Sequence, residues 1–357
     1  MTGPPAKKFS DTSTSRGGDE SERQFRYFTP AKRRASLYED VTCDTQPSVH
    51  RHLLRGWPLC FEDGRTTWDD RSTALKSRDW FAFRDPLGLW ERPFYQLGAR
   101  AEAQIDAAVA SARRDGLFDD FDPAWVEFLR TNLQIPAFAE HGLWLAMASI
   151  GRDCLSDSIT HAVVFEAASK QRTAQSIVLY AMDLENHFGS FEIAAAKTRW
   201  LEHEAWQPVR ELVERLHYVN DWGEVIVATN LLFEPLIGTM IRRELGIRAA
   251  RVNGDTVTAA IVTPSQAEAA WAADWTIPLV RHVIEDEAHG GHNREVIAGW
   301  IDSWLPSCNA AVDALTSIIS DLPVGFSSEQ ARERVSASAA QIREQAGIAD
   351  LVKAAVA

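Results

Sequence analysis

The chain has 357 residues, of which 45% are hydrophobic, and a formal net charge of −13. This length suits one large domain or two smaller ones with a sizeable core. The acidic balance argues against nucleic acid as a partner, because phosphate binding needs a basic footprint. No apolar run reaches the roughly 18 residues needed to span a membrane, so we expect no membrane partner.

Residues 1–24 are rich in Ser, Thr, Gly, Pro and charged residues, which predicts a disordered tail. This segment also lacks the apolar stretch of a secretory signal. The cysteines Cys43, Cys60, Cys154 and Cys308 are far apart and form no CxxC pair. They are typical of reduced thiols in a cytoplasmic protein rather than of disulfides or a zinc site.

Residues 25–96 predict an extended arm, because Pro and Gly interrupt them repeatedly. The arm is nevertheless rich in large aromatic residues: Trp57, Phe61, Trp68, Trp80, Phe81, Phe83, Trp90, Phe94 and Tyr95. So much aromatic surface cannot stay in water along an extended segment. The arm can pack on its own helices or on another subunit, where aromatic residues and Arg are enriched. We favour a mixture, with a subunit interface as part of it.

From residue 97 onward the pattern predicts helices almost throughout, with no strand of useful length and no internal repeat. The expected helices cover 98–115, 122–150 with a kink at Pro136, 157–187, 191–210, 209–219, 223–245, 264–289, 292–305 ending near Pro306, 309–321 and 327–346. Asp122-Pro123 looks like an N-cap with Pro at the first helical position. The fold class is therefore all-α, one helical bundle behind an N-terminal arm.

The segment 157–187 organises this reading. It has no Gly or Pro and is apolar on several sides, which predicts a central helix. Six residues recur at steps of three and four and therefore share one polar face: Ala162, Glu166, Ser169, Thr173, Ser176 and Tyr180. This face carries hydroxyls where a metal-binding bundle would place carboxylates and imidazoles.

A bundle of this length can be tested for a di-iron carboxylate site, which needs a Glu from each of two helices and Glu-x-x-His from each of two others. The fragments that qualify superficially are Glu214 with His217 and Asp286 with His289, with Glu185 and Glu234 as conceivable partners. The first fragment lies in a charged helix near its end, and Gly290-Gly291 follows the second. Both therefore favour solvated helix ends over iron ligands.

A zinc site is the other metal candidate, formed by His282, Glu285, His289 and His292. Histidines at a helix end more often interact with its last carbonyls. We therefore predict no catalytic, cofactor-binding or metal-ligating residue on this chain.

Six segments carry a family resemblance by their order and spacing: 33–42 (RRASLYEDVT), 55–73, 79–96, 165–175 (FEAASKQRTAQ), 221–238 (DWGEVIVATNLLFEPLIG) and 289–306. Together they resemble the β (small hydroxylase) subunit of the soluble bacterial multicomponent di-iron monooxygenases. Those enzymes hydroxylate methane, propane, phenol, toluene and alkenes. Only the N-terminal tail and the last helices fall outside the match.

The resemblance implies a ferritin-like helical bundle over 97–357 without a metal site, since only the α subunit of this family keeps the iron ligands. Lys170 and Thr173 stand where α-subunit ligands would be, and Thr229 or Asn230 lies near the position where α presents a Glu. A Lys and a Thr cannot replace Glu and His as iron ligands. The resemblance therefore implies a non-catalytic chain.

The implied assembly is an α2β2 hydroxylase in the cytoplasm, with a small γ subunit as an optional third chain. NADH electrons would come through a reductase with FAD and an Fe–S centre, and a coupling protein would gate the di-iron site in α. The sequence looks most like the propane monooxygenase branch. The alternatives are a phenol, alkene or cyclic-ether monooxygenase β subunit, a self-sufficient di-iron carboxylate protein, and a helical interaction protein unrelated to oxygenases.

Overall fold

The computed structural model describes residues 29–32, 34–43, 45, 64 and 69–352. The predictions for the tail 1–24 and for Trp57, Phe61 and Trp68 lie outside these residues. Cys43, Cys154 and Cys308 are buried in the interior. Burial raises the pKa of Cys308 to about 12, so this thiol stays protonated.

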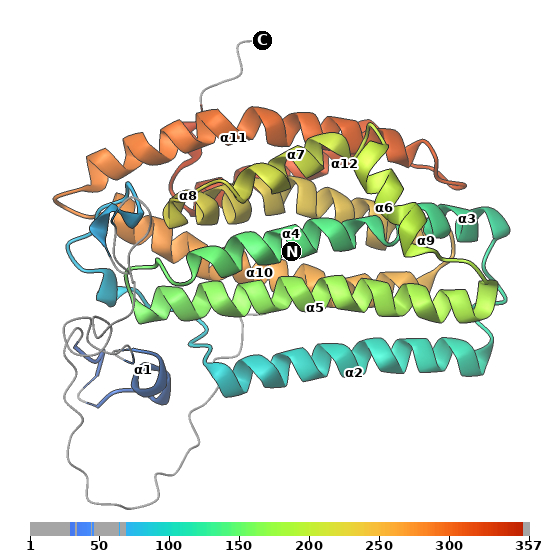
Figure 1. Ribbon diagram of the computed structural model, residues 1–357, viewed down its shortest axis with the longest axis horizontal. Coiled ribbons are helices and arrows are strands. Elements are labelled where there is room, and N and C mark those ends of the chain that lie inside the picture. The colour runs from blue at the N-terminus through green and yellow to red at the C-terminus, as the bar shows by residue number, and fades with distance from the viewer. Residues whose placement is uncertain (1–28, 33, 44, 46–63, 65–68, 353–357) are drawn as a thin grey trace, which may run out of the picture.

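The described residues form a layered bundle of long helices and contain no strand, which confirms the all-α prediction (Figure 1). The elements in chain order are α1 (Leu37–Thr42), η2 (Asp70–Ser72), η3 (Trp80–Ala82), α2 (Glu91–Asp115), α3 (Pro123–Asn132), α4 (Ile135–Ile150), α5 (Asp157–Phe188), α6 (Ile193–Glu202), α7 (Gln207–Leu216), α8 (Trp222–Val227), η4 (Ala228–Gly238), η5 (Met240–Arg248), α9 (Ala249–Val252), α10 (Thr256–Ile284), α11 (Gly290–Ile319), α12 (Ser328–Gln345) and η6 (Ala349–Leu351). Helices α2, α4, α5, α10 and α11 run side by side along the long axis.

The most enclosed helix is the continuous segment Trp222–Val252, in which η4 and η5 are π-helical. Its length and mean hydropathy would suffice to cross a membrane, so the statement that no apolar run is long enough was wrong. The most apolar stretch is 89% buried inside the bundle. The hydropathy of this segment is therefore explained by its place in the core.

Helix α5 matches the predicted range 157–187 within one residue. Ser156 caps its start by accepting a hydrogen bond from Ile159 N, and Gly189, with φ of 70°, follows its last turn. The prediction that other helices surround α5 was wrong. Its outer side leaves three apolar side chains open to solvent: Val164 (47% exposed), Leu179 (61%) and Met182 (54%).

Several helix boundaries differ from those predicted; the segment 191–210, for example, divides between α6 and α7. α2 begins at Glu91 rather than near residue 98, because Pro93 lies in the first turn, where no intrahelical N–H donor is needed. α10 begins at Thr256, where the Asp255 carboxylate accepts hydrogen bonds from two backbone N–H groups. α11 continues through Pro306, so the two predicted helices 292–305 and 309–321 are one. Burial of Trp304 and Cys308 on either side of the proline fits the continuous helix.

Residues 69–90, which we call the strap, pack on the helices of the same chain. Leu75, Trp80 and Phe83 of the strap are buried, and the Trp80 ring meets the Trp222 ring edge-on with centroids 5.2 Å apart. This part of the arm therefore follows the first of the two interpretations given above. Contact with another subunit stays a prediction for the arm residues that are not described.

Candidate functional site

Four charged side chains meet in the interior of the bundle, each from a different element: Glu140 (α4), Lys170 (α5), Glu234 (η4) and Arg242 (η5). Lys170 Nζ donates to Glu234 Oε1 and lies 3.8 Å from Glu140 Oε2. Arg242 donates to Glu234 Oε2 and, at 2.9 Å, to Glu140 Oε1. We call these residues the charge quartet; two carboxylates and two cations make it neutral.

The two carboxylates of the charge quartet respond differently to the cations beside them. Burial raises the pKa of Glu140, because it outweighs the opposing charges of Lys170 and Arg242. Burial alone raises the pKa of Glu234, but Arg242 and Lys170 outweigh burial and lower this pKa to about 2. Burial alone lowers the pKa of Lys170, but Glu234 and Glu140 outweigh it and raise this pKa. Removing any one member would leave an unpaired charge away from water, which is strongly destabilising.

The π-helical geometry and a glycine make room for the quartet. Glu234 and Arg242 are eight residues apart on the same segment, and Gly238 lies between them. A Cβ atom at Gly238 would overlap both Glu234 Oε2 and the Arg242 guanidinium. Gly238 therefore lets the ion pair lie directly over the backbone. π-helical segments inside α-helices are frequent at functional sites.

Glu166 of α5 forms a second polar centre beside the quartet. Its Oε2 accepts hydrogen bonds from Asn230 Nδ2 at 2.9 Å and Trp275 Nε1 at 3.1 Å. The same Asn230 amide donates to Thr276 Oγ1 at 2.9 Å. Burial raises the pKa of Glu166 to about 7, because the opposing effect of the Lys170 charge is smaller than the effect of burial.

The polar face predicted on α5 points inward, as its spacing implied. Tyr180 donates to or accepts from Thr258 Oγ1 at 2.8 Å, and Thr173 Oγ1 lies 3.4 Å from Glu268 Oε2. The interior of the bundle holds carboxylates as well as these hydroxyl groups. Three carboxylates, those of Glu140, Glu166 and Glu234, project inward from three helices, as the carboxylates of a di-iron bundle do.

These carboxylates do not fit a di-iron centre. Lys170 and Arg242 already neutralise two of them, and an iron pair would have to displace both cations. The histidine ligands that such a centre needs are not among the charge quartet or its neighbours at Asn230 and Thr276. Over the described ranges, no group of three or more His, Cys, Asp or Glu residues is arranged to hold a metal ion.

The fragments proposed for iron do not converge. Glu214 is exposed and pairs with Arg210 at 2.6 Å, one turn away on α7. His217 follows the end of α7, and its Nε2 lies 2.9 Å from the Gly142 carbonyl oxygen. Glu185 is exposed near the end of α5. Four of the residues considered for iron lie outside the α10–α11 turn: Glu214, His217, Glu185 and Glu234. Of these, only Glu234 lies in the interior.

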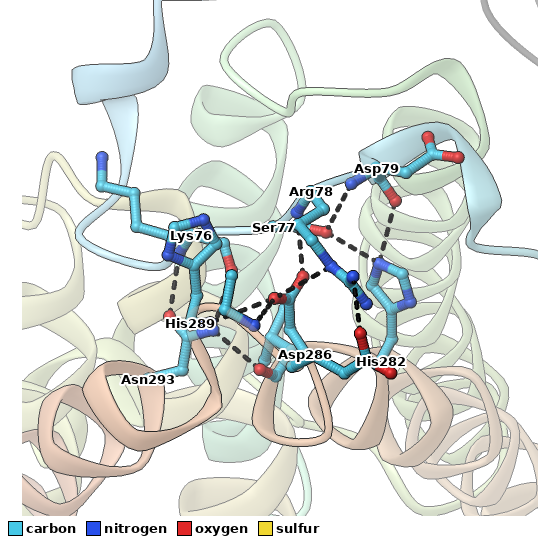
Figure 2. A network of polar contacts seen from close by, with 11 residues as sticks. Lys76, Ser77, Arg78, Asp79, His282, Asp286, His289 and Asn293 are labelled. Atoms are coloured by element: carbon cyan, nitrogen blue, oxygen red, sulfur yellow. Dashed lines mark hydrogen bonds and ion pairs between the residues drawn. The ribbon is translucent and has the colours of Figure 1, made fainter.

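Asp286 lies at the α10–α11 turn, where it and two of the histidines proposed for zinc, His282 and His292, hold the strap (Figure 2). Asp286 Oδ2 accepts from Arg78 N at 2.9 Å, while its Oδ1 accepts from Ala288 N at 2.9 Å and His289 N at 3.1 Å. The hydrogen bond from Arg78 N is the main reason that the pKa of Asp286 is lowered. This carboxylate is therefore a hydrogen-bond acceptor for backbone amides on both sides of the contact.

The ring nitrogens of two histidines contact strap backbone rather than the last carbonyls of their own helix. His282 Nε2 lies 3.0 Å from Asp79 O, and His292 Nε2 lies 2.9 Å from Ala74 O. Between them, Asn293 accepts from Lys76 N at 2.8 Å and donates to Lys76 O at 2.7 Å (Figure 2). Glu285 is exposed at the end of α10. The polar cluster is thus a docking point for residues 74–79.

Sequence reasoning missed Glu140 and Arg242 altogether. A signal was present: Glu140 is the one acidic residue in the apolar α4, and Arg242 lies in the long apolar segment 223–245. A charge in such a segment is expected to have a buried partner. The sequence does not show which residue is the partner, because Glu140 and Arg242 are 102 residues apart.

Comparisons with known proteins agree with this architecture. The profile of the family described as Methane/Phenol/Alkene Hydroxylase matches residues 57–287. The chain is 38% identical over 297 residues to the propane 2-monooxygenase hydroxylase component small subunit of Rhodococcus jostii (strain RHA1), covering 83% of this chain and 81% of that protein. It is 29% identical over 303 residues to the methane monooxygenase component A beta chain of Methylosinus trichosporium, covering 82% and 77%.

The fold matches a solved structure as well. A chain of phenol hydroxylase from Pseudomonas sp. OX1 superposes with a TM-score of 0.75 at 18% identity, covering 93% of this chain and 98% of that chain. At 18% identity this match supports the helical-bundle fold and nothing more. The family profile and the relatives at 35–38% identity also show the family. The chain belongs to the methane/phenol/alkene hydroxylase family, among relatives that are small subunits of monooxygenase hydroxylase components.

Proposed function

We propose that this chain is the small β subunit of a multicomponent monooxygenase hydroxylase, and that it scaffolds an iron-bearing α subunit without binding iron itself. The observation that carries the proposal is the charge quartet. Lys170 and Arg242 neutralise two carboxylates in the bundle interior, where a di-iron protein would hold metal. In such an interior the carboxylates of Glu140 and Glu234 are paired with cations of the chain rather than with iron.

The assembly that fits is an α2β2 hydroxylase in the cytoplasm, with a γ subunit as an optional third chain. A reductase with FAD and an Fe–S centre would deliver electrons from NADH, and a coupling protein would act on the α subunit. The names of the relatives as component small subunit and component beta chain support a multicomponent enzyme. The chemistry would be insertion of one atom of O₂ into a C–H bond, carried out in α.

Sequence identity to the relatives indicates propane as the substrate. Identity is 38% to a propane 2-monooxygenase small subunit and 29% to a methane monooxygenase beta chain. Identity falls further, to 24% and 23%, for toluene and phenol enzymes. Since the substrate pocket would lie in α, this preference rests on the ancestry of the chain and on none of its side chains.

Co-expression with the α subunit tests the proposal directly. The purified hydroxylase should contain two irons per α, and the full-length chain purified without α should contain none by elemental analysis. NADH-dependent propane oxidation should need α, this chain, the reductase and the coupling protein together. Two irons per chain in the isolated protein, lost on replacing Glu214 and His217, would instead establish a self-sufficient di-iron protein.

A further inference from the structure

A cavity of about 90 Å³ lies between α2, α3, α5, η5 and α10. Its walls are mostly apolar, with side chains such as Phe128, Leu245 and Ile261. The polar face of α5 contributes Thr173 and Ser176, which are partly exposed, and the inner end reaches the charge quartet. The cavity thus runs from the accessible side of α5 into the centre of the bundle.

The inner lining holds polar atoms that make no hydrogen bond with a protein group. Four lining residues, each at most 8% exposed, have a buried atom without a hydrogen-bond partner: Asn132 Oδ1, Glu140 Oε2, Trp206 Nε1 and Arg242 Nε. Two of these atoms accept hydrogen bonds and two donate them. Buried polar atoms are normally paired, so an occupant that both donates and accepts is expected here.

Charge and size restrict that occupant. The charge quartet is already neutral, so an ion bound beside it would lack a counter-ion in a poorly solvated place. A cavity of roughly 150 Å³ holds one benzene molecule. At about 90 Å³, this cavity has room for three to five non-hydrogen atoms. The apolar walls require that most of those atoms be carbon.

We propose that this cavity binds a short-chain aliphatic alcohol, a neutral molecule with an apolar body of about three carbon atoms and one hydroxyl group. The hydroxyl would meet the unpaired atoms near Asn132 and Glu140, and the carbon atoms would lie against the apolar wall. The site is formed by side chains of this chain. Its existence does not depend on the proposed function, because the cavity belongs to this chain alone.

Titration of the full-length chain with 1-propanol, followed by saturation-transfer NMR and calorimetry, tests the site. Binding should be saturable with a Kd on the order of 1 mM, the range that a well-fitted ligand of four non-hydrogen atoms can reach. Ser176→Phe should fill the cavity and abolish binding. Gln175→Phe, an exposed neighbour on the same helix, is the matched control and should bind as the wild type does.

Two further variants separate the alternatives. Ile105→Phe enters the cavity from α2 and replaces Ser176→Phe if that variant does not fold. Asn132→Leu should weaken 1-propanol binding at least about tenfold and leave 1-chloropropane binding unchanged, because only the alcohol needs the polar atoms. Unsaturable binding would mean that the cavity holds water only, and would overturn the proposal. Equal binding by both cavity-filling variants, or preference for 1-chloropropane in the wild type, would overturn it too.

Discussion

Glu140 of α4 accepts a 2.9 Å hydrogen bond from Arg242, which follows it by 102 residues in the chain. The same Arg242 also binds Glu234, and Lys170 binds the other carboxylate oxygen of Glu234. The interior of the bundle is therefore held by alternating charges from four elements. Such an arrangement is stable only as a complete set, since each member cancels the desolvation cost of the others.

Glu234→Gln should reduce the free energy of unfolding by about 3–5 kcal/mol, because Lys170 and Arg242 would then share one carboxylate in a buried setting. Urea unfolding of the full-length chain measures the loss. Glu214→Gln is the control, since it breaks an exposed pair with Arg210 that is worth at most about 1 kcal/mol. Equal losses for the two variants would contradict the assignment of the quartet as a buried ion-pair network.

Glu166 should make stability depend on pH. Burial raises its pKa from 4.5 to about 7, so between these values the folded chain holds a proton that the unfolded chain has released. The corresponding stability is fully present below about pH 4.5 and is lost as the pH rises to about 7, a change on the order of 3 kcal/mol.

Glu166→Gln imitates the protonated acid and should remove that decline. Unfolding free energies measured from pH 4.5 to 8 should therefore fall less steeply in this variant than in the wild type, by up to about 1.4 kcal/mol per pH unit. Glu185→Gln, at an exposed position on the same helix, is the control and should keep the wild-type slope. Parallel slopes for Glu166→Gln and wild type would show that Glu166 is ionised throughout this range.

Asp286→Ala should release the strap from the α10–α11 turn. The carboxylate accepts from Arg78 N and from two amides of the turn, and hydrogen bonds to a charged group are worth about 2 kcal/mol each. Amide hydrogen exchange at residues 76–79 should therefore become roughly 30-fold faster.

His289→Ala combined with His292→Ala is the comparison for the strap. Only one ring contact with the strap is lost, that of His292 with Ala74 O. Turnover of the assembled hydroxylase should stay within a few-fold of wild type. A loss of activity with assembly intact would mean that these histidines have a role in catalysis.

Deletion of residues 25–60 should abolish or strongly weaken co-purification with the α subunit. An obligate interface commonly buries more than about 2,000 Å² and depends on aromatic anchors, in which this segment and its continuation are rich. Circular dichroism should show that the helices remain folded, and size exclusion reports the assembly. A truncated chain that still forms a full-size hydroxylase would transfer the main contact to a helical face, with the exposed Leu179 and Met182 of α5 as its first candidate.

The helices could be predicted well because their signals are local. Asp122-Pro123 marked the start of α3, and the absence of Gly and Pro over 157–187 marked α5 within one residue. The prediction that a helix ends near Pro306 was wrong. Proline weakens a helix but does not end it when packing on both sides of the proline holds the helix together. The outer side of α5 was also predicted wrongly, because periodicity does not show which apolar side of a helix is left exposed.

The interior of the site was only half predictable. The family resemblance placed Lys170 at a ligand-like position, but its partners Glu140 and Glu234 come from segments 30 and 64 residues away. Long-range pairing of this kind has no local signature. The role of Asp286 and His292 was hidden for the same reason, since they contact strap backbone more than 200 residues earlier.

The neutrality of the charge quartet also constrains how this chain can change over evolutionary time. A single Lys170→Glu replacement would leave three carboxylates beside one guanidinium, and a single Arg242 replacement would leave two carboxylates beside one ammonium. Each step towards a ligand set that binds metal passes through an intermediate with uncancelled charge in the core. Gly238 adds a second barrier, because a larger residue there overlaps the existing ion pair. A change of this core towards metal binding would therefore need several simultaneous substitutions.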